Sequence, residues 1–418
     1  MRTIIVVLAA LLLGASSSAE ELQLAALIDE ALKNNPDIRI SQARIEAAKY
    51  RIPQVKSLPD PMVSVGYQNV GLNRYSYGDY SESQWMFTAS QMFPYFGKRA
   101  LKGEMAERDM ENLQAMDEAV RLKTIARVKE LYYDLFLSYK SIDILREKRE
   151  LFSKIEELSM ARYGAGKAPQ QEVVMAQTEK YMLFEKEEMF NQKILSTEAM
   201  LRATIGRESK SPLGRPTEPF PSTFNADMDT VLKGAYERSP EIKSRERMVE
   251  AAKAKLAMSK KEYYPDVTVG AGVFPRGGDF QEIWGLTATF NIPVYFGTKQ
   301  GPGVQEAGAS LTQSRHELDS VNYMVAAAIQ DNYSMLTATG KLMDLYKNGL
   351  MPKTYQDFEL ALSGYGTGRV EAIVVITRLK TLLDYDLLYW GQFVEREKAI
   401  ARLCSIAKIP DTHTGEKN

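Results

Sequence analysis

The sequence predicts a mainly α-helical protein with membrane β-strands, built as a tandem-duplicated helix–strand–strand–helix protomer. Three observations predict this fold class. Landmarks of the first half recur in the same order in the second half, each half contains a helical pattern of about sixty residues, and each half holds two alternating segments of strand length. With 418 residues, the chain is long enough for two or three domains or for one long repetitive one.

The chain opens with the pattern of a cleavable export signal over residues 1–19. Arg2 supplies a positive charge, residues 4–13 are an apolar run, and Ser17, Ser18 and Ala19 are small residues suited to cleavage. An apolar run of 10 residues is too short to cross a bilayer as a helix, and no later stretch is apolar for 18 residues. We therefore expect an exported mature chain that begins near Glu20.

Composition excludes several classes of function. Charge is balanced, with 53 basic and 54 acidic residues, which argues against nucleic acid as a partner. The two histidines and the single cysteine, Cys404, leave little for a metal site and no disulfide framework, and the role of Cys404 stays open. Met105, Met110 and Met116 fall within a helical pattern, where methionine usually fills the core. Since no hydrolase or P-loop motif is present, we expect no catalytic residue, cofactor or metal.

The duplication is visible as aligned landmarks. "NNPDIRISQARIEAAKYRI" (34–52) aligns with "RSPEIKSRERMVEAAKAKL" (238–256), and "PYFGK" (94–98) aligns with "PVYFGTK" (293–299). The same order of landmarks would hardly arise by chance. We expect a first repeat at 20–206, a proline-rich linker at 207–229, a second repeat at 230–408 and a flexible tail at 409–418.

Each repeat is expected to pair one long helix with two short ones. The long helices are predicted at 99–162 and 300–364, where apolar residues recur every three or four positions and form a narrow seam. At about 1.5 Å per residue such a helix is roughly 95 Å long. In the first repeat the return path is two shorter helices, 36–56 and 170–205. A solvated coiled-coil rod would fit the helical segments alone.

The predicted strands argue against a simple rod. They lie at 62–70, 84–93, 266–274 and 283–292, and each has the length of a tilted strand that crosses a bilayer. Large apolar residues alternate with small or neutral polar ones, as expected for lipid outside and water inside. A soluble sheet packed on a core also alternates, but no other segment offers a surface for these strands to cover. The expected lipid-facing residues are Val63, Val65, Tyr67, Trp85, Phe87, Val267, Val269, Trp284 and Leu286.

Four strands cannot close a barrel, and a membrane permits no open sheet edge. Several copies must therefore share one barrel. Two copies would give eight strands around a filled lumen, and three would give twelve strands with room for water. The small residues on the second face favour the wider barrel.

The duplicated plan, the "YFGK" start of the long helix and the turns "YGAG" (163–166) and "YGTG" (365–368) resemble the TolC-type outer-membrane efflux proteins. The resemblance covers about residues 22–408. It implies a homotrimer with a 12-stranded β-barrel in the outer membrane, continued by a long α-helical barrel in the periplasm. "SQMFPYFGKR" (90–99) and "LPDP" (58–61) are most similar to the heavy-metal and cation efflux branch. Many relatives carry a lipidated cysteine after the signal, and this sequence has none there.

The same resemblance implies the function and the partners. The trimer would be the passive exit duct of a tripartite efflux pump or of a type I secretion system. It would work with a periplasmic adaptor (a membrane fusion protein) and an inner-membrane pump of the resistance-nodulation-division type. The exported substrate is not readable from the sequence. The competing interpretation is a periplasmic coiled-coil adaptor or a structural spacer without a barrel of its own.

The two glycine-containing turns are predicted to be helix-hairpin tips, at 163–169 and 365–370. A tight reversal needs positive φ, which glycine tolerates. In the family such tips meet the adaptor, although the glycines could simply turn the chain. The expected docking residues are Tyr163, Gly164, Gly166, Lys167, Tyr365, Gly366, Gly368 and Arg369.

Two further expectations concern the tunnel. Gly349 and Pro352 should kink the second long helix, since proline removes a backbone donor and clashes with the preceding turn. A tolerated surface proline is the alternative. Family members often place an aspartate six residues after the second glycine of each tip. That position is Glu172, also a carboxylate, in the first repeat but Val374 in the second. Glu172 is therefore expected at the tunnel entrance, or else it is an exposed residue in the first turn of a helix.

Overall fold

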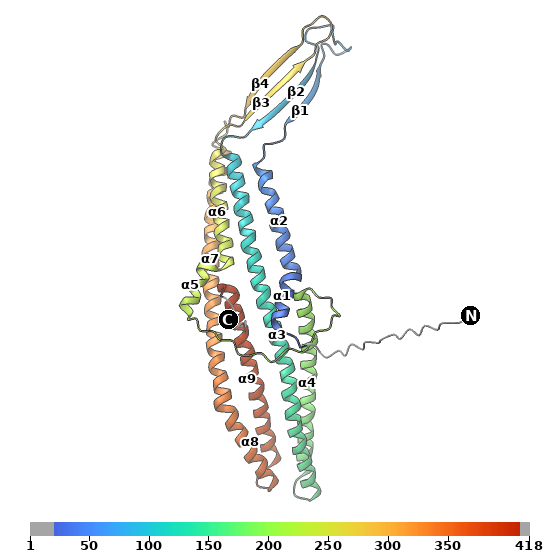
Figure 1. Ribbon diagram of the computed structural model, residues 1–418, viewed down its shortest axis with the longest axis vertical. Coiled ribbons are helices and arrows are strands. Elements are labelled where there is room, and N and C mark those ends of the chain that lie inside the picture. The colour runs from blue at the N-terminus through green and yellow to red at the C-terminus, as the bar shows by residue number, and fades with distance from the viewer. Residues whose placement is uncertain (1–20, 410–418) are drawn as a thin grey trace, which may run out of the picture.

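The computed structural model describes residues 21–409, so the expected signal at 1–19 and residues 410–418 of the expected tail lie outside the described residues. The molecule is a long stack of helices with one four-stranded sheet at its end (Figure 1). Among the described residues no helix is both long and apolar enough to span a membrane.

The two halves have the same order of elements. The first half contains α1 (Leu24–Asn34), α2 (Pro36–Lys56), β1 (Met62–Gln68), β2 (Gln84–Phe93), α3 (Lys98–Gly164) and α4 (Gln170–Ile205). The second contains α5 (Met228–Arg238), α6 (Pro240–Lys261), β3 (Val267–Phe274), β4 (Ile283–Phe290), α7 (Gln300–Asp344), the π-helical segment η1 (Leu345–Leu350), α8 (Met351–Gly366) and α9 (Ala372–Ala407).

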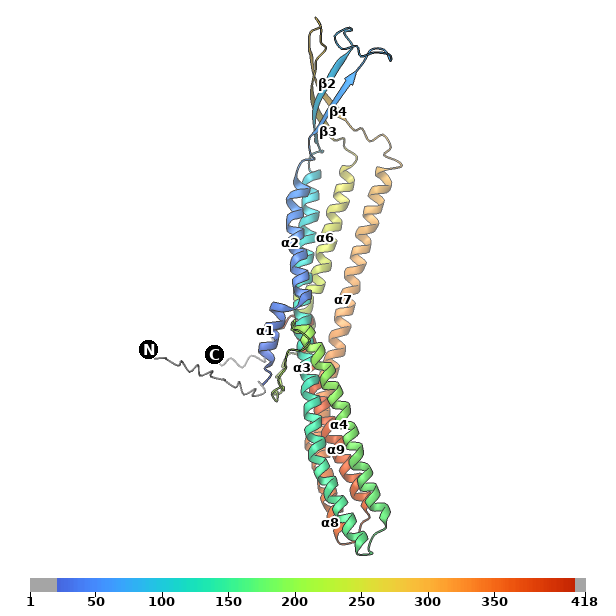
Figure 2. The ribbon, with the colours of Figure 1, turned by 90° about the vertical axis from the view of Figure 1, so that its right-hand side faces the viewer.

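In each half two short helices lie end to end along one long helix. Near the sheet the helices contact one another in the order α2, α3, α6, α7, and farther away α4, α3, α9 and α8 follow the same pattern (Figures 1 and 2). Asn35 fixes the junction between the short helices of the first half. Its side-chain oxygen accepts the N–H groups of Asp37 and Ile38 at 2.8 and 3.2 Å, while its amide donates to the carbonyl of Thr204 at 2.8 Å. This side chain caps α2 and joins it to α4.

Short helices that the sequence analysis missed lie at the waist of the molecule. α1 packs its buried Leu27 and Ala31 against α3 and α4. α5 begins at Met228, so the linker predicted to extend to residue 229 ends earlier. Each of these helices has only 11 residues, so its apolar stripe is stabilised by tertiary packing rather than by helix propensity.

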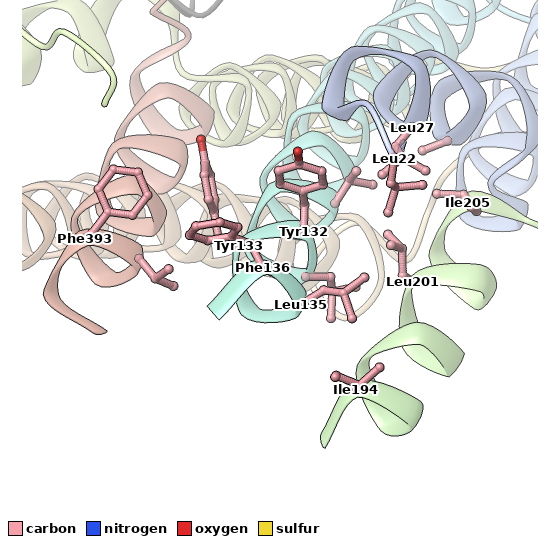
Figure 3. Close-up of a cluster of buried hydrophobic side chains, with 14 of the residues drawn as sticks. Leu22, Leu27, Tyr132, Tyr133, Leu135, Phe136, Ile194, Leu201, Ile205 and Phe393 are labelled. Carbon is pink, nitrogen blue, oxygen red and sulfur yellow. The ribbon is translucent and has the colours of Figure 1, made fainter. Parts of the chain in front are cut away.

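The central core lies where α1, α3, α4 and α9 meet. Figure 3 shows Tyr132, Tyr133 and Phe136 of α3 between Phe393 of α9 on one side and leucines of α1 and α4 on the other. Tyr132 and Tyr133 are both at most 2% exposed, and their rings meet edge to face with centroids 5.8 Å apart. Burial of one such side chain contributes about 1.5–3 kcal/mol, so this cluster anchors the waist.

The sheet is antiparallel in the order β1-β2-β3-β4, and β2 pairs directly with β3 of the other repeat. Three strands are shorter than predicted. β1 ends at Gln68 because Asn69 turns the chain, its amide donating to the carbonyls of Val70, Gly71 and Arg74. β4 ends at Phe290, since Asn291 binds the backbone of Asp266 and Pro293 has no N–H to donate. β3 begins at Val267, because the N–H of the preceding Asp266 is bound by the side chain of Asn291.

Candidate functional site: the sheet and the helix tips

The register of the sheet places all nine expected lipid-facing residues on one face. Val65 lies opposite Phe87, Phe87 opposite Val273, and Val273 opposite Trp284, so these residues form an apolar row across the four strands. Gln91, opposite Val269, is a polar residue on the same face. In the single chain this face is open, with Val63 74% and Leu286 72% exposed. An exposed apolar surface of this extent marks a site that is covered by lipid or by another protein.

The second face of the sheet has a row of small and neutral polar residues in its middle. Ser64 and Thr88 lie opposite each other with hydroxyl oxygens 2.5 Å apart, and Thr88 in turn faces Gly272. A Cβ atom on Gly272 would lie 2.8 Å from the Thr88 methyl group, so the neighbouring side chains already fill the space above this glycine. Small residues thus form a row across this face, between larger side chains such as Met86 and Phe274.

A buried lysine fixes the junction between sheet and helices. Lys98, the last residue of the "YFGK" motif, has a side chain only 3% exposed, and its ammonium lies 2.9 Å from the carboxylate of Asp266 and 3.3 Å from Glu262. Asp266 also accepts the N–H of Tyr95 at 2.7 Å. Burial alone would raise the pKa of Asp266, but the Tyr95 N–H and the Lys98 ammonium outweigh it and hold this pKa below its ordinary value. The contact joins the two repeats.

The two tips have the same backbone geometry. In the first, the N–H of Lys167 donates to the carbonyl of Arg162 at 2.8 Å and that of Gly166 to Tyr163 at 2.9 Å, which is a Schellman motif. Arg369 and Gly368 repeat both bonds in the second tip, at 2.9 and 3.0 Å.

Only the second glycine of each turn needs its conformational freedom. Gly166 and Gly368 have φ of 69° and 79°. The expectation that Gly164 and Gly366 also adopt positive φ is wrong, because these residues are the last helical residues of α3 and α8.

The two tip tyrosines lie in different surroundings. Tyr163 is 49% exposed, whereas Tyr365 is fully buried, so the ring of Tyr365 is not part of the surface that the tip presents. Arg162 covers this ring, with its guanidinium carbon 4.6 Å from the ring centroid, and also donates to the Tyr365 carbonyl. The remaining docking residues expected from the sequence, Gly164, Gly166, Lys167, Gly366, Gly368 and Arg369, are exposed.

Glu172 lies in the first turn of α4 and is half-buried rather than free. The hydroxyl of Tyr365 donates to its carboxylate at 2.9 Å and lies 2.8 Å from the hydroxyl of Ser159. Burial, with a smaller contribution from Glu172, raises the pKa of Tyr365, which stays neutral and keeps donating. The sequence analysis missed Arg162 and Ser159 in this cluster. The sequence does contain a sign of the role of Arg162. It stands directly before the first "YGxG" turn, whereas the second repeat has Gly364 at the equivalent position.

The second long helix changes its geometry beside the residues expected to kink it. α7 ends at Asp344, η1 contains Gly349, and Pro352 is the second residue of α8. The helix predicted as continuous over 300–364 is therefore interrupted by a π-helical turn, and Figure 1 shows its path changing direction between α7 and α8. A π turn frees backbone carbonyls from the regular α pattern, which relieves the clash that proline would cause.

Cys404 is half-buried on α9, and burial raises the pKa of its thiol. Within residues 21–409, no three histidine, cysteine or acidic side chains are grouped as a metal site would require.

Comparisons with known proteins agree on one family. Residues 27–207 match the model of the outer membrane efflux proteins. The chain is 24% identical to the nickel-cobalt-cadmium resistance protein NccC of Alcaligenes xylosoxydans xylosoxydans, over 78% of this chain and 73% of that protein. It is 22% identical to the probable outer membrane lipoprotein SilC of Salmonella typhimurium, over 89% and 84% of the two chains. Its fold is similar to a crystal structure of CusC, with a TM-score of 0.79, 14% identity and 92% of each chain covered.

Proposed function

We propose that this chain is an outer membrane efflux protein, as its similarity to that family indicates, and that three copies of it form one exit duct through the outer membrane. The protein lies in the outer membrane with its helical part in the periplasm, where it passes on substrates delivered from the inner membrane. The observation that carries the trimer is the four-stranded sheet, which has one open apolar face and two edge strands, β1 and β4, without a partner in the described chain.

The two unpaired edge strands and the apolar face together favour a sheet that is closed into a barrel. An open edge in lipid leaves backbone groups unsatisfied at several kcal/mol each, so β4 of one copy pairs with β1 of the next. Three copies give a barrel of 12 strands, the sheet of each being four. The row Ser64, Thr88, Gly272 and Gly285 on the second face, where each residue is small, then lines a lumen wide enough for water.

The tips are the proposed contact with the periplasmic adaptor. They lie at the end of the helices farthest from the sheet (Figure 1). Tyr163, Lys167 and Arg369 present an aromatic ring and two cations there, beside two exposed glycines that allow close backbone approach. Glu172 is proposed to line the entrance, with its carboxylate oriented by Tyr365. An inner-membrane pump of the resistance-nodulation-division type completes the assembly.

Metal cations are the proposed cargo. NccC is described as a nickel-cobalt-cadmium resistance protein and CusC as a part of a cation efflux system. The fold is similar to that of CusC over 92% of the chain, which favours the duct over a periplasmic adaptor without its own barrel.

Expression and fractionation test the duct. We expect an oligomer in outer-membrane extracts that resists dodecyl sulfate until heated, with the mass of three chains. Loss of the gene should increase sensitivity to nickel, cobalt or cadmium, and the restored gene should reverse this. A monomer, or a protein found only in the soluble or inner-membrane fraction, would disprove the duct, whereas unchanged metal sensitivity would disprove only the cargo.

A further inference from the structure

A cavity lies where the sheet meets the helices of the second repeat. β4 ends at Phe290, α7 begins at Gln300, and the segment between them covers the end of α6, leaving a space of about 460 Å³. In the proposed duct the end of a strand marks the membrane boundary, so the cavity lies at the level of the lipid headgroups. This location rests on the proposed function.

The outer side of the cavity continues the apolar face of the sheet. Ile292, Val294 and Tyr295 line it and are 70%, 64% and 72% exposed, although they belong to no strand. Phe290, on the apolar face of β4, is 54% exposed just before them. Acyl chains can therefore run from the sheet to the mouth of the cavity without crossing a polar surface.

One side of the cavity offers hydrogen-bond donors without partners. The ammonium of Lys299 makes no hydrogen bond or ion pair within the described part of the chain. The Asn291 amide oxygen accepts the N–H of Asp266 at 2.6 Å, and its amide also donates toward the Asp266 carboxylate, so this side chain is held in place and keeps one N–H for a ligand. A cation and an amide donor in the lining of one cavity suit a phosphate.

Acceptors lie on the same lining. The side-chain oxygen of Gln300 is buried and has no hydrogen-bond partner in the described chain, which is unfavourable unless a ligand supplies a donor. The carboxylate of Glu262 is 48% exposed and lies 3.3 Å from Lys98, whose ammonium is already shared with Asp266. Gln300 and Glu262 can both accept from a primary ammonium group.

We propose that this cavity binds the headgroup of an ethanolamine phospholipid. The phosphate lies at Lys299 and Asn291, the ammonium at Gln300 and Glu262, and the acyl chains along Ile292 and Val294. Charge complementarity identifies the occupant, because the donors and acceptors of the cavity match a zwitterion that has a phosphate and three N–H donors. A choline headgroup lacks those donors, and a glycerol headgroup lacks the positive charge.

Native mass spectrometry of the assembled oligomer tests this proposal. The protein is purified in a mild detergent and titrated separately with the ethanolamine, choline and glycerol phospholipids of the same acyl chains, and with inorganic phosphate. We expect the ethanolamine lipid to bind about tenfold or more tightly than the choline lipid, a difference of about 1.4 kcal/mol. Inorganic phosphate should not compete at millimolar concentration.

Substitutions in the lining test whether the lipid binds in this cavity. Lys299→Ala and Gln300→Leu should each weaken ethanolamine-lipid binding about tenfold, and Gln300→Leu should abolish the preference over choline. Lys341→Ala and Gln305→Leu, on exposed positions of the same helix, are matched controls and should bind as the wild type does. Equal binding of all three lipids, competition by phosphate alone, or an oligomer that retains no lipid would overturn the proposal. These outcomes leave the duct intact, whereas a protein that fails to assemble would question the duct itself.

Discussion

The Lys98–Asp266 contact should carry more stability than any surface ion pair of this chain. Replacing Lys98 with Met leaves the Asp266 carboxylate, 12% exposed, without a cationic partner and with only neutral donors, the N–H of Tyr95 and the side chain of Asn291. Removing one partner of a buried pair usually costs 3–5 kcal/mol. We expect about 3 kcal/mol for Lys98→Met. Asp266→Asn should cost about 2 kcal/mol, because Glu262 still faces the ammonium.

The assay is urea unfolding of the detergent-solubilised oligomer at fixed protein concentration, followed by the loss of helical circular dichroism. The double variant Lys98→Met/Asp266→Asn should lose about 3 kcal/mol, less than the two single losses together, because its second change removes an unpaired charge. Lys253→Met is the control. It breaks the exposed pair with Glu250 and should change stability by less than about 1 kcal/mol. Strictly additive losses in the double variant would refute the reasoning, because they would mean that the two groups do not interact.

Four further predictions address the same molecule. The stability contributed by Asp266 should be fully present above the ordinary aspartate pKa of about 3.9 and should be lost as the pH falls through its lower folded-state pKa. A free energy of unfolding that does not change with pH below about pH 4 would contradict this prediction. Val65→Arg should reduce the assembled oligomer on heated and unheated gels, at a cost of about 2–4 kcal/mol in mid-bilayer, and should do so more than Ser64→Arg; equal losses would reverse the assignment of faces. Glu172→Gln should weaken cation selectivity in single-channel recordings, and unchanged selectivity would return this residue to the ordinary helix surface. Pro352→Ala should let the π-helical turn relax toward an α-helix, seen as added hydrogen-exchange protection at residues 345–350, and unaltered exchange would show that proline does not set the bend.

Much of the architecture could be predicted from the sequence, because its local signals agree with its long-range pattern. α2 begins at Pro36 and ends at Lys56 as expected, since Asn35 caps it and proline suits a first helical position. The alternation of the strands likewise predicted which residues share a face, and the register agrees for all nine.

Features that depend on contacts between repeats could not be predicted. Tyr163 and Tyr365 occupy equivalent positions in similar motifs, yet only Tyr365 is buried, because Arg162 of the other repeat covers it. The burial of Lys98 has the same origin, since both of its carboxylate partners come from the second repeat. Local sequence cannot reveal such differences, because the partner lies far away in the chain.

The contacts at the two ends of α3 have a consequence for how the chain folds. Lys98 at one end binds a residue 168 positions away, and Arg162 at the other end binds one 203 positions away. Such separations give a high contact order, which slows folding because long loops must close before these contacts form. During export the first repeat emerges first, so α3 and the open edge of β2 wait for their partners. While they wait, the similarity of the repeats allows the corresponding segments of a second chain to take the same place. The duplication that simplifies the architecture therefore also creates a risk of exchange between chains, and it makes protection of the nascent first repeat a requirement for efficient assembly.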